Sequence, residues 1–306
     1  MSSLIKRPAE IIGKETIAAL IYGQPGMGKT TLACSAPKPV LFDFDGGIDR
    51  VRLEHQVPTV QITSWDDAQA ALKELEGAPG EYQTIIVDTA SKMIDCIIYK
   101  ICGTAQPQIK QWGLINAAFK SFLRSVQQLR MNVVFVAQRE SEKNGEEVRQ
   151  IPQFRASNYK DVICDLDVCG YMEMVTVKGE EIRRITFNPT SRNEGKNTAE
   201  FLPYYDLPTL APGQANTFLS DRFAEFVTRQ HEKAKQRAAI IKEVSDKVAA
   251  YQKEADAAKD AAAVNALCDK MKKEKVVGDL RIRLLQIITN RAKALNLKLN
   301  KDKRYE

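Results

Sequence analysis

Residues 16–30 read TIAALIYGQPGMGKT, an apolar run followed by a complete Gly-x-x-x-x-Gly-Lys-Thr motif. The run 16–22 has the length of a buried strand, and the residues after the motif suit a first helical turn. In a strand–loop–helix context such a motif directs backbone N–H groups at phosphate oxygens. Lys29 is expected to reach the β- and γ-phosphates and the Thr30 hydroxyl to ligate Mg2+. The predicted nucleotide-contacting residues are Gly23, Gln24, Pro25, Gly26, Met27, Gly28, Lys29, Thr30 and Thr31.

Length and composition set the class of protein. The 306 residues suffice for one large core, or for one core with a small second domain. No apolar run approaches the roughly 20 residues of a membrane span, and the first ten residues lack a secretory segment. The six cysteines form no C-x-x-C pair, and the two histidines, His55 and His231, are far apart, which argues against a zinc site. These features predict a cytoplasmic protein with no membrane partner.

Charge is distributed unevenly along the chain. Residues 231–306 carry a net charge of +8, whereas residues 1–230 carry a net charge of −2. We therefore predict an ATPase core over residues 1–215 and a basic helical C-terminal domain over residues 216–306. The basic domain is equally consistent with attraction of a nucleic acid and with a solvated helical surface.

Apolar strand-like runs alternate with helical stretches from residue 16 to about 190. This alternation predicts an α/β fold, with a central, mostly parallel sheet and a small α-helical C-terminal extension. Lys178-Gly179 separates two strand-like runs and predicts a hairpin, while the proline-containing stretch 202–214 reads as a linker or surface segment. The predicted strands are 16–22, 39–45, 59–62, 84–89 and 132–138. The predicted helices are 90–102, 113–130, 220–258, 261–274 and 279–295.

Three further polar residues follow predicted strands. Asp88 ends the run TIIVD, the arrangement of a Walker B carboxylate that completes a magnesium shell. Its neighbour Thr89 is not a glutamate, so a water-orienting acid has to come from elsewhere. Asp45, just past the second strand, lies where ligands bind in parallel sheets, although Asp45-Gly46-Gly47 is also consistent with a simple polar turn. Gln138 ends the fifth strand and is a candidate sensor of the γ-phosphate.

The phosphate loop, LFDFDGGID, TIIVDT and NVVFVAQRE together resemble the core of the RecA recombinase family, especially its short phage-encoded relatives with a RecA-like AAA ATPase domain. The resemblance covers roughly residues 12–200. It implies a catalytic role for Asp45, a structural role for Asp49, and a Gln138 that leads into a mobile DNA-binding loop. It also implies ATP and Mg2+ as cofactors, a ring or filament of identical subunits, and, for a phage protein, the host cytoplasm.

The same resemblance implies two DNA-binding loops, at about 103–112 and 139–160. Cations interleaved with aromatic side chains suit a single strand, whose bases stack and whose phosphates need neutralising, although the second loop also carries glutamates. Trp112 has an alternative role as a core anchor of the next helix. Arg192 and Lys196 are candidate cationic fingers for a neighbouring subunit's nucleotide. The candidate DNA-binding residues are Lys110, Trp112, Arg139, Lys143, Arg149, Phe154, Arg155 and Lys160.

These patterns favour an ATP-dependent, single-stranded-DNA-binding recombination or annealing protein that hydrolyses ATP at subunit interfaces in a DNA-stimulated reaction. A single-strand-binding or replication protein is a further candidate partner. Two alternatives stay open on the sequence: a P-loop ATPase acting as a replication loader or adaptor, and a small-molecule or nucleotide kinase.

Overall fold

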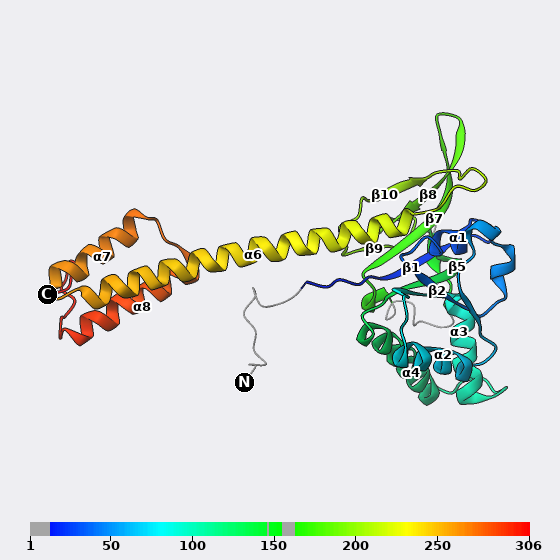
Figure 1. The fold of residues 1–306 in the computed structure, drawn as a ribbon, viewed down its shortest axis with the longest axis horizontal. Helices are drawn as coiled ribbons and strands as arrows, with labels where there is room; N and C mark the ends of the chain where they lie inside the picture. The colour runs from blue at the N-terminus through cyan, green and yellow to red at the C-terminus, as the bar shows by residue number, and fades with distance from the viewer. Residues whose placement is uncertain (1–12, 146, 155–162) are drawn as a thin grey trace. The chain divides into compact units, whose positions relative to one another are not determined.

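The computed structural model describes residues 13–145, 147–154 and 163–306 (Figure 1). Their contacts divide the chain into two compact units, one spanning Lys14–Gln230 and the other containing His231–Glu306. The sequence placed the boundary after residue 215. The structure places it later, within the helix α6 (Phe218–Ala257), because Leu219, Phe223 and Phe226 at the start of that helix belong to the core of the first unit.

The first unit contains a ten-stranded sheet among its described residues. Its main path runs β10-β8-β7-β1-β5-β4-β2-β3, with β6 paired to β5 and β9 paired to β7. The six strands from β7 to β3 are parallel, whereas β8 and β10 are antiparallel. The strands are β1 (Ala18–Gly23), β2 (Pro39–Asp43), β3 (Thr59–Gln61), β4 (Thr84–Asp88), β5 (Asn132–Asn144), β6 (Glu147–Pro152), β7 (Val168–Val177), β8 (Glu180–Thr186), β9 (Lys196–Asn197) and β10 (Tyr204–Leu207).

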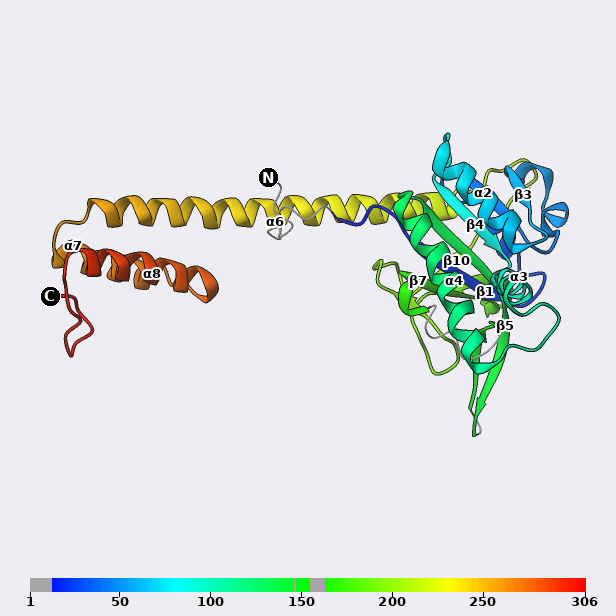
Figure 2. The ribbon, with the colours of Figure 1, turned by 90° about the horizontal axis from the view of Figure 1, so that it is seen from below.

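Helices cover both faces of this sheet. The core on one face joins alternate strand residues to the apolar sides of α2, α3 and α4, which Figure 2 shows on the same side of the sheet. The core on the other face joins the remaining strand residues to α1 and the start of α6. The helices of this unit are α1 (Lys29–Ala33), α2 (Trp65–Gly77), α3 (Ala90–Cys102) and α4 (Ile109–Gln128). The predicted mostly parallel α/β fold is confirmed.

Several elements differ from their predicted bounds. The helix α2 was not predicted, although Ser64 and Asp67 form a capping box at its start. Helix α4 begins at Ile109 rather than at residue 113, and β5 continues past Gln138 to Asn144. The stretch 202–214 contains β10, an edge strand paired with β8, so it is not a linker throughout.

The second unit has its own apolar core. The later turns of α6 contribute Tyr251 and Ala255, and they pack with residues of α7 (Ala261–Lys273) and α8 (Gly278–Ala294), such as Leu267 and Ile288. The predicted C-terminal helical region is therefore present. Across the described residues, every helix is too short or too polar to span a bilayer.

Candidate nucleotide-binding site

The parallel strands bring three predicted site residues, together with Asp43, to one edge of the sheet. Gly23 at the end of β1 lies opposite Gln138 on β5, and Asp43 at the end of β2 lies opposite Asp88 at the end of β4. Strand β5 lies between β1 and β4. Because the strands are parallel, their carboxyl ends meet at this edge, where ligands of open α/β sheets bind.

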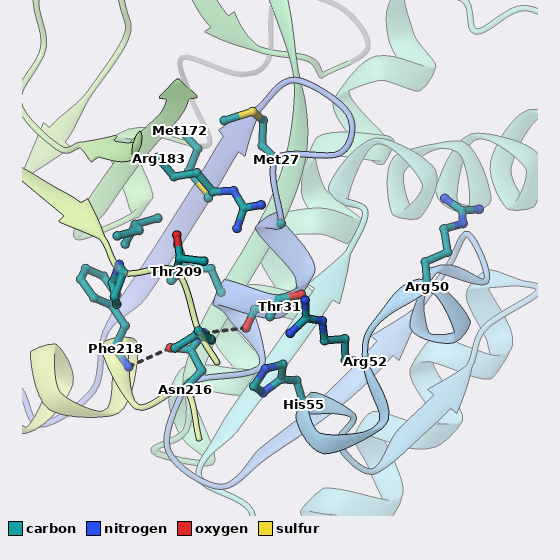
Figure 3. A pocket seen from close by; sticks show the side chains of 15 residues that line it. Met27, Thr31, Arg50, Arg52, His55, Met172, Arg183, Thr209, Asn216 and Phe218 are labelled. Carbon is teal, nitrogen blue, oxygen red and sulfur yellow. Dashed lines mark hydrogen bonds between the residues drawn. The ribbon is translucent and has the colours of Figure 1, made fainter. Parts of the chain in front are cut away.

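The loop between β1 and α1 is held open by glycine. Gly26 and Gly28 have φ angles of +77° and +82°, which side-chain-bearing residues rarely adopt. A Cβ atom on Gly23 would lie 2.5 Å from the carbonyl oxygen of Met172 on β7. The glycines therefore allow both the turn and the close approach of two strands, and Figure 3 shows the resulting loop between β1 and α1.

Lys29 and Thr30 place their polar atoms against the strand ends. The Lys29 ammonium donates to the carbonyl oxygens of Gly23 (3.1 Å) and Gln24 (2.7 Å), and to Oε1 of Gln138 (3.1 Å). The Thr30 hydroxyl donates to Oδ2 of Asp88 at 2.5 Å. The predicted lysine, threonine, aspartate and glutamine therefore form one contiguous cluster.

Burial changes the acid–base behaviour of this cluster. Asp88 is 3% exposed, and desolvation raises its pKa to about 6, with smaller contributions from the negative charges of Asp45 and Asp43. The hydrogen bond from Thr30 acts in the opposite direction. Burial also lowers the pKa of Lys29, against the attraction of Asp88 and Asp45. The cluster therefore lacks a cation close enough to offset the buried carboxylate of Asp88 fully.

Asp43 and Asp45 have different roles in the loop after β2. The buried carboxylate of Asp43 accepts hydrogen bonds from the backbone N–H groups of Asp45, Gly47 and Ile48, so it shapes the turn. Asp45 is half-buried, and its Oδ1 atom has no hydrogen-bond partner within the described structure. Burial, together with the charge of Asp43, raises the pKa of Asp45. Asp45 therefore has a carboxylate oxygen without a hydrogen-bond partner in the described structure. The residue that stabilises the loop is Asp43, and not the exposed Asp49.

A family model described as an AAA domain matches residues 15–199. That range contains the phosphate loop, the ends of β2 and β4, and all of β5. The chain belongs to this AAA-domain family. Residues 15–199 are therefore an AAA-type P-loop ATPase domain, and the cluster described above lies within this range. A search of curated protein sequences finds no match to this chain.

The cluster of the AAA domain lines a cavity of about 230 Å3. Asp45 lines this cavity from the loop after β2, and Gln138 lines it from β5. Thr31 and Arg50 line both this cavity and a second hollow beside the phosphate loop. Among the described residues, no group of three or more His, Cys, Asp or Glu side chains is placed to hold a metal ion. A magnesium ion here would rely on Thr30, Asp88 and phosphate oxygens, as Mg2+ in phosphate sites commonly does.

The described candidate DNA-binding side chains differ in burial and in their partners. Phe154 is 5% exposed in the core beneath the sheet, so its ring is not available to stack on a base. Trp112 is half-buried against the same core, which favours its alternative role as an anchor of α4. Arg149 forms an ion pair with Glu194 at 3.2 Å. Arg155 and Lys160 lie outside the described residues.

The remaining candidates lie on a helix and a hairpin rather than on open loops. Lys110 is exposed in the first turn of α4. Residues 139–152, predicted as a loop, form the β5–β6 hairpin. The prediction of a loop was wrong for a physical reason. Both faces of this two-stranded hairpin carry polar residues, so the sequence lacks the alternation of apolar and polar residues that predicts a strand.

The two candidate finger residues differ in availability. Lys196 donates to the carbonyl oxygens of Ile163 (2.9 Å) and Cys164 (2.7 Å), so its ammonium is held within its own subunit. Arg192 is exposed, and its backbone carbonyl accepts from the N–H of Gln150 on β6. The structure therefore leaves Arg192 as the accessible cation of this pair.

Proposed function

We propose that the AAA domain hydrolyses Mg2+-bound ATP and couples this reaction to single-stranded DNA. The supporting observation is the position of Gln138, whose amide holds Lys29 while its strand continues without a break into the β5–β6 hairpin. We expect the Gln138 side chain to respond to the γ-phosphate. From Gln138 onward, β5 leaves the nucleotide site and forms the hairpin with β6, so a change at Gln138 can reach the hairpin.

The residues fit a magnesium nucleotide. The buried Asp88 carboxylate and the Thr30 hydroxyl would hold the ion, which supplies charge neutralisation of the phosphates. Lys29 would bind the β- and γ-phosphates. Asp45 lines the same cavity, and its carboxylate would orient the attacking water and accept its proton.

A phosphate oxygen is a stronger partner for Lys29 than a neutral amide oxygen. Nucleotide binding would therefore release the Gln138 side chain from Lys29 and allow it to contact the γ-phosphate. Gln138 also accepts, through its backbone carbonyl, the N–H of Gln153 after β6 at 2.7 Å. Gln138 therefore lies at the base of both hairpin strands, and its side chain is the group that we expect to exchange Lys29 for the γ-phosphate.

The hairpin separates its charges by face. Arg139, Ser141 and Lys143 share one face of β5, because successive strand residues alternate. The register places Glu142 opposite Arg149, so Glu140 and Glu142 lie on the other face, where Glu147 also lies. Arg139 and Lys143 therefore form a cationic face without a carboxylate on either strand of the hairpin.

Single-stranded DNA fits this arrangement. Cations neutralise its phosphates and exposed aromatic rings stack on its bases at roughly 1–3 kcal/mol each. Tyr99 near the end of α3 is exposed, as is Lys110 at the start of α4. The chain as a whole would act in recombination or annealing, and exposed Arg192 would reach the nucleotide of a neighbouring copy in a ring or filament.

The test is ATP hydrolysis with and without single-stranded DNA, in the wild type and in Gln138→Ala. We expect wild-type turnover to rise several-fold with DNA. Gln138→Ala should retain ATP binding and lose the stimulation, while Gln128→Ala, an exposed glutamine on α4, should behave as wild type. Lys29→Ala should abolish turnover. If no nucleic acid changes wild-type turnover, the DNA-coupled function is wrong.

A further inference from the structure

The helix α8 of the second unit exposes apolar side chains on the side away from its core. Figure 1 shows α8 beside α7 and the later turns of α6, and these helices share one apolar core. Leu284, Ile288 and Ala292 of α8 point into that core and are at most 1% exposed. Ile282 lies two residues before Leu284 and therefore on nearly the opposite side of the helix, since one turn takes about 3.6 residues. Its side chain is 65% exposed.

Cations lie at both ends of this exposed side. Arg281, Leu285, Thr289 and Lys293 follow one another at four-residue spacing, so they form one ridge along α8. Leu285 is 38% exposed, and Ile282 is next to it on the surface. We call Arg281, Ile282, Leu285 and Lys293 the α8 outer face. Its two cations are about 18 Å apart along the helix, from a rise of about 1.5 Å per residue.

The positive charge of the α8 outer face is not neutralised within the described part of the chain. Arg281 and Lys293 are exposed, and neither forms an ion pair with another described residue. Asp279 is the one acidic residue of α8, and it is paired with Arg283 at 2.7 Å. The two cations are therefore available to carboxylates of another molecule.

A nucleic acid fits this face poorly. Single strands bind through cations together with aromatic rings on which their bases stack. Residues 231–306 contain two aromatic residues, Tyr251 and Tyr305, and both pack in the core of the second unit. A bound strand would find no exposed ring beside Arg281 and Lys293, and it would leave Ile282 in contact with water.

A second copy of the same face also fits poorly. In a symmetric contact each residue meets the same residue or its counterpart on the other copy. Parallel pairing would bring Arg281 to Arg281, and antiparallel pairing would bring Arg281 to Lys293. Both arrangements place cations opposite cations, so the charge of the face favours a partner of opposite sign.

We propose that the α8 outer face binds an acidic amphipathic helix of another protein. Apolar side chains at helical spacing would cover Ile282 and Leu285, and carboxylates at the two ends would pair with Arg281 and Lys293. The matched AAA domain ends at residue 199, so this surface lies outside it. Binding of such a partner is independent of the proposed ATP hydrolysis and of the proposed contact with DNA.

The experiment follows the fluorescence anisotropy of a labelled synthetic helix during titration with the full chain, in the absence of nucleotide and DNA. The peptide has about 16 residues, with leucines at i, i+3, i+4 and i+7 and glutamates at both ends of that stripe. A second peptide carries lysine in place of every glutamate. The wild-type chain should bind the glutamate peptide at least about tenfold more tightly than the lysine peptide, and salt should reduce this difference.

Variants of exposed residues locate the binding surface. Arg281→Glu combined with Lys293→Glu should weaken binding of the glutamate peptide at least about tenfold, because like charges would then meet. Leu285→Ser should weaken it about tenfold through the loss of an apolar contact. Lys253 and Ile240 are exposed on α6 and provide matched controls. Lys253→Glu and Ile240→Ser should bind the peptide as the wild type does.

Three results would overturn the proposal. The first is a wild-type chain that binds neither peptide or binds both equally. The second is a loss of affinity for single-stranded oligothymidylate in the charge-reversed variant that equals its loss for the glutamate peptide, which would identify a nucleic-acid surface. The third is a lower mass of Leu285→Ser than of the wild type in size-exclusion chromatography with light scattering, which would identify a contact between copies. Absence of ATP turnover would instead refute the proposed function and leave the α8 outer face untouched.

Discussion

Replacing Asp88 with asparagine should stabilise the metal-free protein while removing its ATPase activity. The carboxylate is 3% exposed and its pKa is about 6, compared with an ordinary value of 3.8. The folded chain thus binds this proton more tightly than the unfolded chain does. Above the folded pKa the buried charge opposes folding by about 3 kcal/mol, since each pKa unit corresponds to about 1.4 kcal/mol.

The pH dependence gives this prediction its sign. Below pH 3.8 Asp88 is largely protonated in both the folded and the unfolded chain, so its burial does not lower the unfolding free energy. The destabilisation appears as pH rises from 3.8 to about 6, and it is complete above about 6. Asparagine keeps an oxygen that accepts from Thr30 but carries no charge. The gain in unfolding free energy should therefore be about 3 kcal/mol near pH 8 and should fall below about 1 kcal/mol near pH 4.

The assay is urea unfolding in the presence of EDTA, followed by tryptophan fluorescence. The two tryptophans, Trp65 and Trp112, both lie in the unit Lys14–Gln230, so the signal reports the ATPase unit alone. Asp49→Asn, which removes an exposed carboxylate, should change stability by less than about 0.5 kcal/mol. An equal effect of Asp88→Asn at both pH values would show that the buried charge is not the cause.

Three other predictions follow from the packing and the charge pattern. Gly23→Ala should cost about 1–3 kcal/mol of unfolding free energy and weaken ATP binding, because its methyl group would meet the Met172 carbonyl; an unchanged variant would contradict that contact. Phe154→Ala should lower unfolding free energy by about 3–5 kcal/mol, and a neutral effect would remove this ring from the core. Lys143→Ala should weaken single-stranded DNA binding and reduce its salt dependence by about one charge, whereas Glu142→Ala on the opposite face should not; equal effects would refute the two-faced hairpin.

Much of the nucleotide site could be read from local patterns. A glycine-rich loop between an apolar run and a helix has few other structural uses, and Asp88 and Gln138 each end a continuous buried run. The C-terminal helices could also be predicted from the sequence, because alanine-rich segments have strong helix propensity. Helix α2 was missed, although its capping residues Ser64 and Asp67 were visible signals in the sequence.

Local sequence patterns did not predict the positions of the candidate DNA-binding residues. Phe154 and Lys143 both lie in a polar, mixed stretch, yet one is buried in the core and the other is exposed on the hairpin. Strand periodicity assigns faces only once the register with β6 is known, and that register separates the glutamates from Arg139 and Lys143. Asp43 was similarly passed over as a structural residue, because its three backbone donors become its partners only when the turn forms.

The sequence by itself determined that this chain has a phosphate loop, a buried strand that ends in Asp88 and an α/β core, because each depends on residues within one strand and its adjacent loop. Only the tertiary structure decided which side chains share a site. Parallel pairing brought Gln138 to Lys29, and the antiparallel return of β8 brought Arg183 to Gly28, from more than a hundred positions away. Such contacts arise from strand order, which no local pattern encodes.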